Sequence, residues 1–239
     1  MSNPIRTIWN SGASVYDAGL HNILPYQRSL DAVIDFLPKS QSLSVLDVGS
    51  GTGALSERIL SVVPSSSVTC LDISEGMMDQ CRRKLESYGS RVRFILADFM
   101  AWEPDQTFDA VVSSNALIYK GIDVGMCYSK YAKALKPGCV FLNSTVFNHK
   151  DLEFFSVIKD IITPPRVQPA SKEETDFSQE LGKSISHTGD NSLLLILSQQ
   201  EHIDRMTGAG LKSVCVWQYL YQMIIMGIKE ENPATPATV

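Results

Sequence analysis

Residues 45–54 read VLDVGSGTGA, and this stretch decides the fold of the chain. A short apolar run carries an acid at Asp47, glycines follow at alternate positions, and residues 55–63 continue with helical spacing. The pattern predicts a buried strand, a tight turn and the start of a helix. Glycines let a ligand lie against the backbone, and the helix N-terminus offers free N–H groups to an anionic group. The stretch therefore predicts a nucleoside cofactor, with Asp47 facing a cationic or hydroxyl-bearing part of it.

The glycine loop alone leaves the kind of cofactor open. Gly49, Gly51 and Ala54 also satisfy the spacing of the dinucleotide fingerprint. The next predicted strand, residues 67–72, ends in Asp72, about twenty residues past the glycines, where a carboxylate can bind both hydroxyls of a ribose. Because a dinucleotide and any other nucleoside cofactor both contain a ribose, this contact does not distinguish between them.

Three further strands are predicted over residues 92–97, 108–115 and 135–142. The first of them ends in Asp98 and Phe99, an acid suited to an adenine amino group and a ring that can pack against the base. Strands that alternate with helices predict a parallel sheet covered on both faces. Ligands of such sheets bind beyond the carboxyl ends of the strands.

The motifs LDVGSGTG, LDISEGMM, ADF, FDAVVSSNAL and LKPGCVFL resemble, in order and spacing, those of the class I S-adenosylmethionine-dependent methyltransferases. The resemblance is to the small-molecule, ubiquinone-biosynthesis-like branch; it covers about residues 43–147 and extends more weakly to 230. One departure is Cys139, where the family often has a second glycine, in the turn expected before the fifth strand. The implied fold is α/β: a Rossmann-like, doubly wound seven-stranded sheet, mostly parallel, with a C-terminal antiparallel hairpin.

The resemblance implies S-adenosyl-L-methionine as cofactor. Its glycine loop would contact the methionine part, Asp72 the ribose, Ile73 and Met77 the adenine, and Asp98 with Phe99 the adenine amino edge. The residues expected to contact the cofactor are Tyr16, Asp47, Gly49, Ser50, Gly51, Gly53, Asp72, Ile73, Met77, Asp98, Phe99, Ser114 and Asn115.

Candidates for the acceptor side are fewer. Tyr16 resembles a tyrosine that relatives fold over the cofactor, but it equally suits an aromatic anchor of the N-terminal helices. Tyr119 either faces the acceptor or caps the following helix. His149, just past the fifth strand, is the candidate catalytic base, and His187 a candidate acceptor contact. His202 is expected on a surface helix.

One domain is predicted over residues 1–239. Within it, the polar, proline-containing run Thr163–Asp176 is expected to be a mobile lid. The expected parts are an N-terminal helical cover (1–40), a cofactor-binding core (43–147), an acceptor-side cap (148–197), a final helix and antiparallel hairpin (198–230) and a disordered tail (231–239).

Composition restricts the remaining function classes. A net charge of -5 gives no reason to expect nucleic acid, and no apolar run is long enough for a membrane span. Five cysteines without a CxxC pair indicate free thiols in a reducing compartment, and the predicted location is cytoplasmic. No metal site is expected.

The sequence thus predicts metal-independent methyl transfer to a small-molecule acceptor, aromatic or apolar, with oxygen, nitrogen and carbon acceptors all open. Residues 113–117 lack the signature of base-amino methyltransferases, and the motifs of arginine-methylating and catechol-type enzymes are missing. Two alternatives stay open. One is a non-methylating member of the fold that still binds the cofactor, as a cyclisation catalyst or a binding partner. The other is a dinucleotide-dependent oxidoreductase.

Overall fold

One sheet of seven strands organises the chain in a computed structural model that describes residues 4–17, 23–146, 172, 175–176 and 193–231. The strand order is β3-β2-β1-β4-β5-β7-β6, and only β7 runs antiparallel to its neighbours. The predicted mostly parallel sheet with a C-terminal antiparallel hairpin is therefore confirmed. The strands are β1 (Ser44–Val48), β2 (Ser67–Asp72), β3 (Val92–Leu96), β4 (Phe108–Ser114), β5 (Leu135–Val146), β6 (Leu211–Tyr219) and β7 (Gln222–Lys229).

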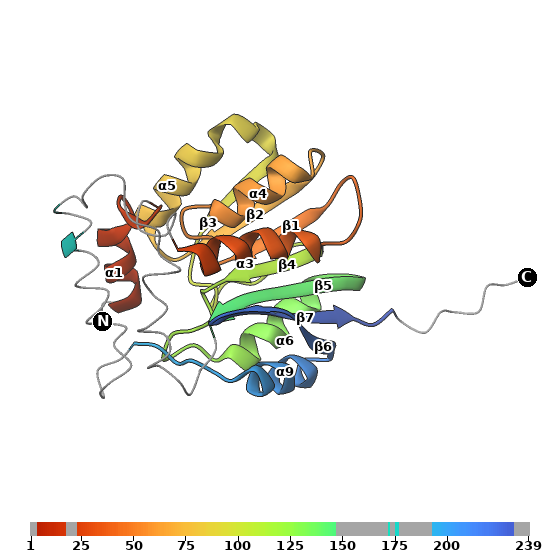
Figure 1. Ribbon diagram of the computed structural model, residues 1–239. Coiled ribbons are helices and arrows are strands. Elements are labelled where there is room, and N and C mark those ends of the chain that lie inside the picture. The colour runs from red at the N-terminus through yellow and green to blue at the C-terminus, as the bar shows by residue number, and fades with distance from the viewer. Residues whose placement is uncertain (1–3, 18–22, 147–171, 173–174, 177–192, 232–239) are drawn as a thin grey trace, which may run out of the picture.

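Helices cover both faces of the sheet (Figure 1). Side chains alternate along each strand, so Val45 of β1 packs toward α3, α4 and α5, while Leu46 packs toward α6 and α9. Both residues are fully buried, which explains why the strand reads as a continuous apolar run. The helices are α1 (Pro4–Gly12), α3 (Leu24–Asp35), α4 (Ala54–Val62), α5 (Glu75–Leu85), the 3₁₀ helix η1 (Glu86–Arg91), α6 (Val124–Ala134) and α9 (Gln199–Gly208).

Local sequence signals set the helix starts. The Ser74 side chain accepts from the Met77 N–H and caps α5, as predicted. Ser198 and Glu201 form a reciprocal capping box at the start of α9. Asp123 caps α6 in the same way by accepting from the Met126 N–H.

One element differs from the prediction. The expected turn before the fifth strand lies inside β5, because the pairing steps from Phe108–Leu135 to Ala110–Val140 and leaves the four residues between them, 136–139, as an irregular bulge. Cys139 therefore belongs to the strand, and the turn-like sequence KPG serves the bulge.

His202 is buried rather than on the surface, with 1% of its area exposed. It lies one turn before the buried Met206, so both face the sheet. Its Nδ1 is 2.7 Å from the Tyr128 hydroxyl, which accepts a hydrogen bond from Asn143 Nδ2 at 2.8 Å. The helix that carries His202 is amphipathic, and the histidine falls on its inner side.

This burial predicts a pH-dependent stability. Desolvation lowers the pKa of His202 from 6.5 to about 4, so the unfolded chain binds its proton first as pH falls. As the pH falls from 7.5 to 5, the buried histidine should therefore lower the free energy of unfolding by about 2 kcal/mol. Asp47, whose pKa burial raises to about 7, acts in the opposite direction over this range. We therefore expect to see the effect when two chains are compared. As the pH falls from 7.5 to 5, the free energy of unfolding of His202→Gln should rise by about 2 kcal/mol relative to that of the unmodified chain. Urea unfolding at both pH values measures it, and a pH-independent difference would contradict it.

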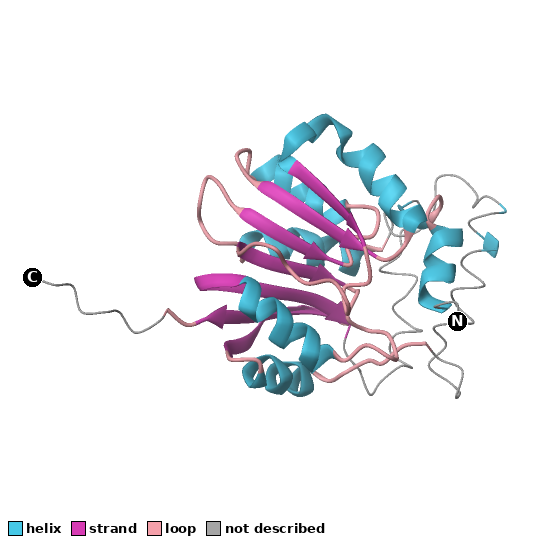
Figure 2. Cartoon of the chain, turned by 180° about the vertical axis from the view of Figure 1, so that it is seen from behind, coloured by secondary structure: helices cyan, strands magenta, loops and turns pink. Residues whose placement is uncertain are grey.

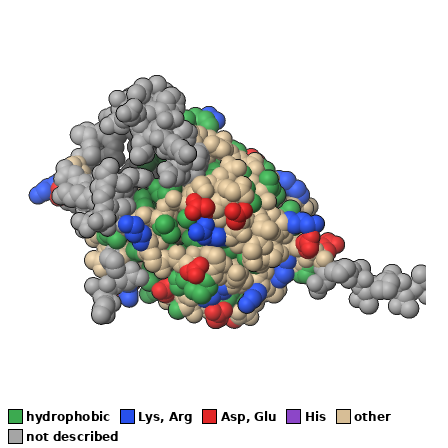
Figure 3. Space-filling view, turned by 90° about the horizontal axis from the view of Figure 1, so that it is seen from below, with side chains coloured by type: hydrophobic (Ala, Val, Ile, Leu, Met, Phe, Trp, Pro, Cys, Tyr) green, Lys and Arg blue, Asp and Glu red, His purple; other side chains and the backbone are tan. Residues whose placement is uncertain are grey.

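No helix in the described part of the chain is long and apolar enough to cross a membrane. Figure 3 shows the molecule from below, where basic and acidic side chains are interspersed among neutral ones. Among the described residues visible on this face, there is no extended patch of one charge.

Candidate cofactor and acceptor site

A cavity of about 430 Å³ lies beyond the carboxyl ends of the parallel strands, and Ile5 and Trp9 of α1 line it. Figure 2 shows the N-terminal helix at this edge of the sheet. This volume falls in the range of small-molecule sites. Loops after β1, β2, β3 and β4 supply most of its wall, so it occupies the place expected for this kind of sheet. The expected site residues that line it are Tyr16, Gly49, Gly51, Asp72, Ile73, Met77, Asp98, Phe99, Ser114, Asn115 and Tyr119.

The glycine loop needs its glycines for different reasons. The N–H groups of Gly49 and Ser50 both donate to the Leu71 carbonyl, which fastens the loop to β2. A Cβ on Gly49 would lie 2.2 Å from the Ala116 Cβ, so no side chain fits there. A Cβ on Gly51 would meet nothing within 4 Å, and Gly51 lines the cavity. Gly51 thus leaves room for a ligand, whereas Gly49 permits a close approach of two chain segments.

Asp72 holds its carboxylate at the cavity wall through backbone N–H groups. Oδ2 accepts from Gly51 N at 2.8 Å, and Oδ1 accepts from Ser74 N at 2.8 Å. Burial raises the pKa of Asp72, while these N–H groups oppose that shift by stabilising the charged form. Each carboxylate oxygen keeps a further lone pair, so the group can accept from two neighbouring hydroxyls.

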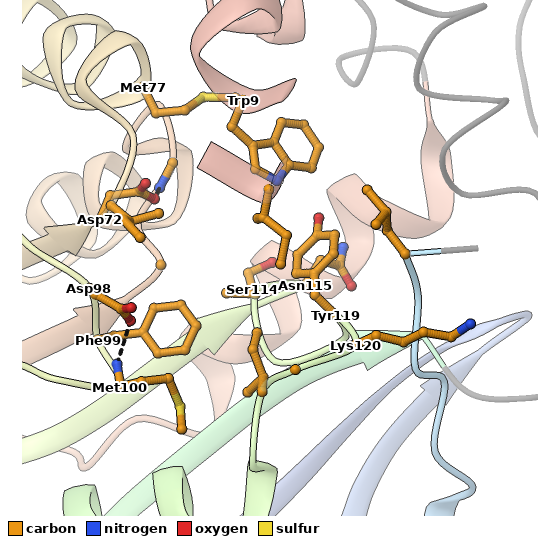
Figure 4. Close-up of a pocket in the computed structure, with 18 of the residues that line it drawn as sticks. Trp9, Asp72, Met77, Asp98, Phe99, Met100, Ser114, Asn115, Tyr119 and Lys120 are labelled. Atoms are coloured by element: carbon orange, nitrogen blue, oxygen red, sulfur yellow. Dashed lines mark hydrogen bonds between the residues drawn. The ribbon is translucent and has the colours of Figure 1, made fainter. Parts of the chain in front are cut away.

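The same end of the cavity carries Met77, Asp98 and Phe99 (Figure 4). Asp98 Oδ1 accepts from Met100 N at 2.8 Å, which orients the carboxylate. The carbonyl of Phe99 accepts from the buried Tyr131 hydroxyl at 2.7 Å and ties this segment to α6. An apolar ring and thioether beside a carboxylate suit a heteroaromatic base that bears an amino group.

Ser114 and Asn115 lie at the end of β4, in the middle of the cavity wall (Figure 4). Asn115 has a φ of 52°, an uncommon left-handed conformation for a residue other than glycine, and its N–H donates to the Ser144 carbonyl. Ser114 Oγ and Asn115 Oδ1 are buried and have no hydrogen-bond partner within the described residues. Buried polar atoms of this kind are suited to a polar group of a ligand.

Three expected contacts do not line the cavity: Asp47, Ser50 and Gly53. Asp47 is 1% exposed and lies behind the loop, where Oδ2 accepts from Ser56 Oγ at 2.7 Å. Because Asp47 belongs to β1 and does not line the cavity, its expected contact with the cofactor stays a prediction. Gly53 has a φ of 83° and occupies the N-cap of α4, where a Cβ would lie 2.8 Å from Cys81 Sγ.

His149 and His187 lie outside the described residues, as does nearly all of the expected lid at 163–176. No histidine is present among the described residues that line the cavity. Likewise, the described residues contain no group of three or more His, Cys, Asp or Glu side chains placed to hold a metal ion.

Sequence reasoning predicted an N-terminal helical cover but did not single out the residues that form the roof of the cavity. Ile5 and Trp9 of α1 line it, and the Trp9 ring packs edge-on against Tyr16 and Tyr119, with centroids 5.3 Å and 6.1 Å apart. Ile5 and Trp9 are four residues apart, and that apolar helix face was the available signal. Further lining residues that were missed are Met100, Ala116, Lys120, Gly121, Ile122 and Leu193.

Both tyrosines that were expected near the site line the cavity. Tyr119 lines the cavity and forms an isolated antiparallel bridge with Leu194, while α6 is capped by Asp123. Tyr16 lines the cavity and its hydroxyl also hydrogen-bonds to that of Tyr26 in α3. Tyr16 is thus both a cavity residue and an anchor.

Comparison with known proteins finds similarity to methyltransferases over part of the chain. Residues 45–138 match the family model described as a methyltransferase domain. Malonyl-[acyl-carrier protein] O-methyltransferase 2 of Ilyobacter polytropus is 28% identical over 154 residues, which are 64% of this chain and 58% of that protein. The chain thus spans little more than half the length of this relative.

Two further similarities extend over more of the chain. Carboxy-S-adenosyl-L-methionine synthase of Nautilia profundicola is 22% identical, covering 84% of this chain and 85% of that protein. The structure of magnesium protoporphyrin IX methyltransferase from Synechocystis PCC 6803 with bound SAH has a TM-score of 0.64 at 17% identity, covering 95% and 98% of the two chains. At that identity the structural likeness shows a shared fold.

Proposed function

We propose that this chain, which carries a class I S-adenosylmethionine-dependent methyltransferase domain, transfers the methyl group of S-adenosyl-L-methionine to a small-molecule acceptor. The observation that carries the proposal is the division of the cavity. One end bears Asp72 and Asp98, the other bears Tyr119 and Lys120 with Asn115 beside them, Ser114 lies between the two ends, and Trp9 lies above (Figure 4).

S-adenosyl-L-methionine is the cofactor of this domain, and the first end of the cavity fits it. Asp72 can accept from the two ribose hydroxyls, Met77 and Phe99 can enclose the adenine, and Asp98 can accept from its amino group. The open space at Gly51 leaves room for the rest of the molecule along the loop. The unpartnered oxygens of Ser114 and Asn115 then face its polar or cationic part.

The second end of the cavity is proposed to bind the acceptor. Trp9, Tyr119, Ile122 and Leu193 give it an aromatic and aliphatic wall, which suits an apolar or aromatic molecule. Burial raises the pKa of the Tyr119 hydroxyl, so this group stays protonated and acts as a hydrogen-bond partner. It accepts from the Trp9 side chain, which holds both rings in place.

The cofactor supplies an electrophilic methyl group on a sulfonium centre. The protein's task is to hold the acceptor in line with that group and to keep water away, since orientation supplies much of the acceleration in such a displacement. Trp9 and Tyr119 form the roof and one wall that exclude solvent, and the strained backbone at Asn115 holds its amide toward the cavity. Where the acceptor needs a base, His149 is the proposed residue, with His187 a proposed acceptor contact.

Incubation with S-adenosylmethionine labelled on the methyl group tests the proposal. A metabolite extract and a defined malonyl thioester serve as acceptors, the latter because of the name of the Ilyobacter relative. We expect label in a small-molecule product with the unmodified chain and none with Asp72→Ala at the same cofactor concentration. Absence of transfer to any acceptor, with the cofactor bound, would reject methyl transfer.

A second candidate is a reaction on the cofactor itself, without methyl transfer to an acceptor. It is favoured by the likeness to the Nautilia synthase, which extends over 84% of this chain. In the same incubation, mass analysis would then find a nucleoside product of altered mass that retains the label. Tighter binding of NAD than of S-adenosylmethionine would instead favour the oxidoreductase alternative.

A further inference from the structure

The N-terminal segment, defined here as residues 4–17, covers the cavity with Trp9 (Figure 4). It also makes polar contacts with the loops at the cofactor end of the cavity. Trp9 and Tyr16 are its cavity residues. Asn10 and Asp17 do not line the cavity but contact the loops that do.

Asn10 contacts the loop after β2. Its Oδ1 accepts from Ser74 Oγ at 2.7 Å and from Gly76 N at 3.2 Å. Ser74 is the residue whose own N–H donates to Asp72. The approach is close: a Cβ on Gly76 would lie 2.9 Å from the Asn10 carbonyl oxygen. Asn10 therefore fastens the donor on one side of the Asp72 carboxylate.

Asp17 contacts the glycine loop in a corresponding way. Its Oδ1 accepts from Thr52 Oγ1 at 2.5 Å, and its Oδ2 lies 2.5 Å from Lys84 Nζ. Thr52 directly follows Gly51, whose N–H donates to the other oxygen of Asp72. The Lys84 and Asp17 side chains are 18% and 34% exposed, so water screens this ion pair less than one at the open surface.

We infer that Asn10 and Asp17 are positioning residues for cofactor binding, because each holds one of the two loops that orient the Asp72 carboxylate. The contacts form a closed ring that runs from Asp72 through Gly51 and Thr52 to Asp17, along the N-terminal segment to Asn10, and through Ser74 back to Asp72. Loosening either loop lets its N–H move away, and the carboxylate then loses the orientation that two vicinal hydroxyls require. The inference rests on the proposed function, since it assigns the ribose to Asp72.

A pair of ligands isolates this effect. Adenosine and 2′,3′-dideoxyadenosine share the base and differ in the hydroxyls proposed to contact Asp72. The ratio of the adenosine affinity to the dideoxyadenosine affinity therefore reports the orientation of the carboxylate. Hydrogen bonds to a charged group predict a ratio of about tenfold or more for the unmodified chain. In Asn10→Ala and in Asp17→Ala we expect the ratio to fall at least about threefold, with dideoxyadenosine affinity nearly unchanged.

Matched variants separate positioning from a merely structural role. Asn10→Asp keeps an acceptor at the N-terminus of α5 and should restore the ratio. Ser11→Ala, on the same helix, and Asp31→Ala, which breaks the exposed ion pair with Arg58, should leave it unchanged. Thr52→Val removes the hydroxyl that donates to Asp17 and is a second way to release the glycine loop should Asp17→Ala fold poorly.

The outcomes are distinguishable. If S-adenosylhomocysteine does not bind the unmodified chain, the proposed function fails. If it binds but the ratio for the unmodified chain is near one, or if Asn10→Ala, Asp17→Ala and Thr52→Val all keep the full ratio, the positioning inference is overturned and the cofactor site stands. A lower ratio in Asn10→Ala, restored in Asn10→Asp, supports it.

Discussion

Gly51→Val should abolish measurable binding of S-adenosylmethionine while the domain stays folded. A Cβ at this position points into open space at the cavity, so the branched side chain would occupy volume that the ligand needs. The φ of 54° adds a strain of about 1–2 kcal/mol, which a domain of this size can absorb. Titration calorimetry, with folding checked by circular dichroism, measures the effect.

Gly89→Val is the matched control for that strain. Gly89 has a φ of 57°, and its Cβ would also meet nothing within 4 Å, but it lies in η1, away from the cavity. Its ψ of -130° lies outside the left-handed helical region, so this variant should lose stability and still keep its affinity for the cofactor. Equal affinities of Gly51→Val and Gly89→Val would show that the cavity at Gly51 is not the binding site.

Asp72→Ala should weaken S-adenosylmethionine binding by about 3 kcal/mol, or roughly 150-fold, because two hydroxyls lose a charged, oriented acceptor. The N–H groups of Gly51 and Ser74 lose their partner as well, so the loops around the ribose should loosen. Asp72→Asn keeps one acceptor oxygen, so its affinity for the cofactor should lie between those of the unmodified chain and Asp72→Ala. Calorimetry on both variants gives the affinities.

The control for Asp72→Ala is Asp105→Ala, which removes a carboxylate from an exposed ion pair with Arg93. Its effect on cofactor affinity should be negligible. An affinity of Asp72→Ala within about twofold of the unmodified chain would contradict the ribose assignment.

The sequence by itself determined the cofactor half of this protein. Its signals are local: glycines at alternate positions, acids at the ends of apolar runs, and a serine cap before α5. In a parallel sheet all strands end at one edge, so Asp72 and Asp98, which lie far apart in the chain, could be placed together without knowing the strand order.

Only the tertiary structure decided which side chains reach the cavity. Asp47 and Asp72 look alike in the sequence, yet Asp47 falls within β1 and is covered by the loop, whereas Asp72 ends its strand and is held at the wall by two N–H groups. His202 was expected outside and is buried. Periodicity shows that a helix has an apolar face, but a polar residue on that face is read correctly only when its partners, here Tyr128 and Asn143, are known.

The roof of the cavity and its supports also required the three-dimensional structure. Asn10 and Asp17 meet Ser74 and Thr52 across 64 and 35 residues of chain, and Trp9 reaches Tyr119 across a longer separation still. Such contacts depend on how α1 docks on α5, which is set by the complementary shape of two surfaces and leaves no repeat or motif in either segment. Neighbouring residues in the sequence are enough to predict a glycine loop or a strand-end carboxylate. The covering of the cavity depends instead on surfaces that meet only when the chain has folded.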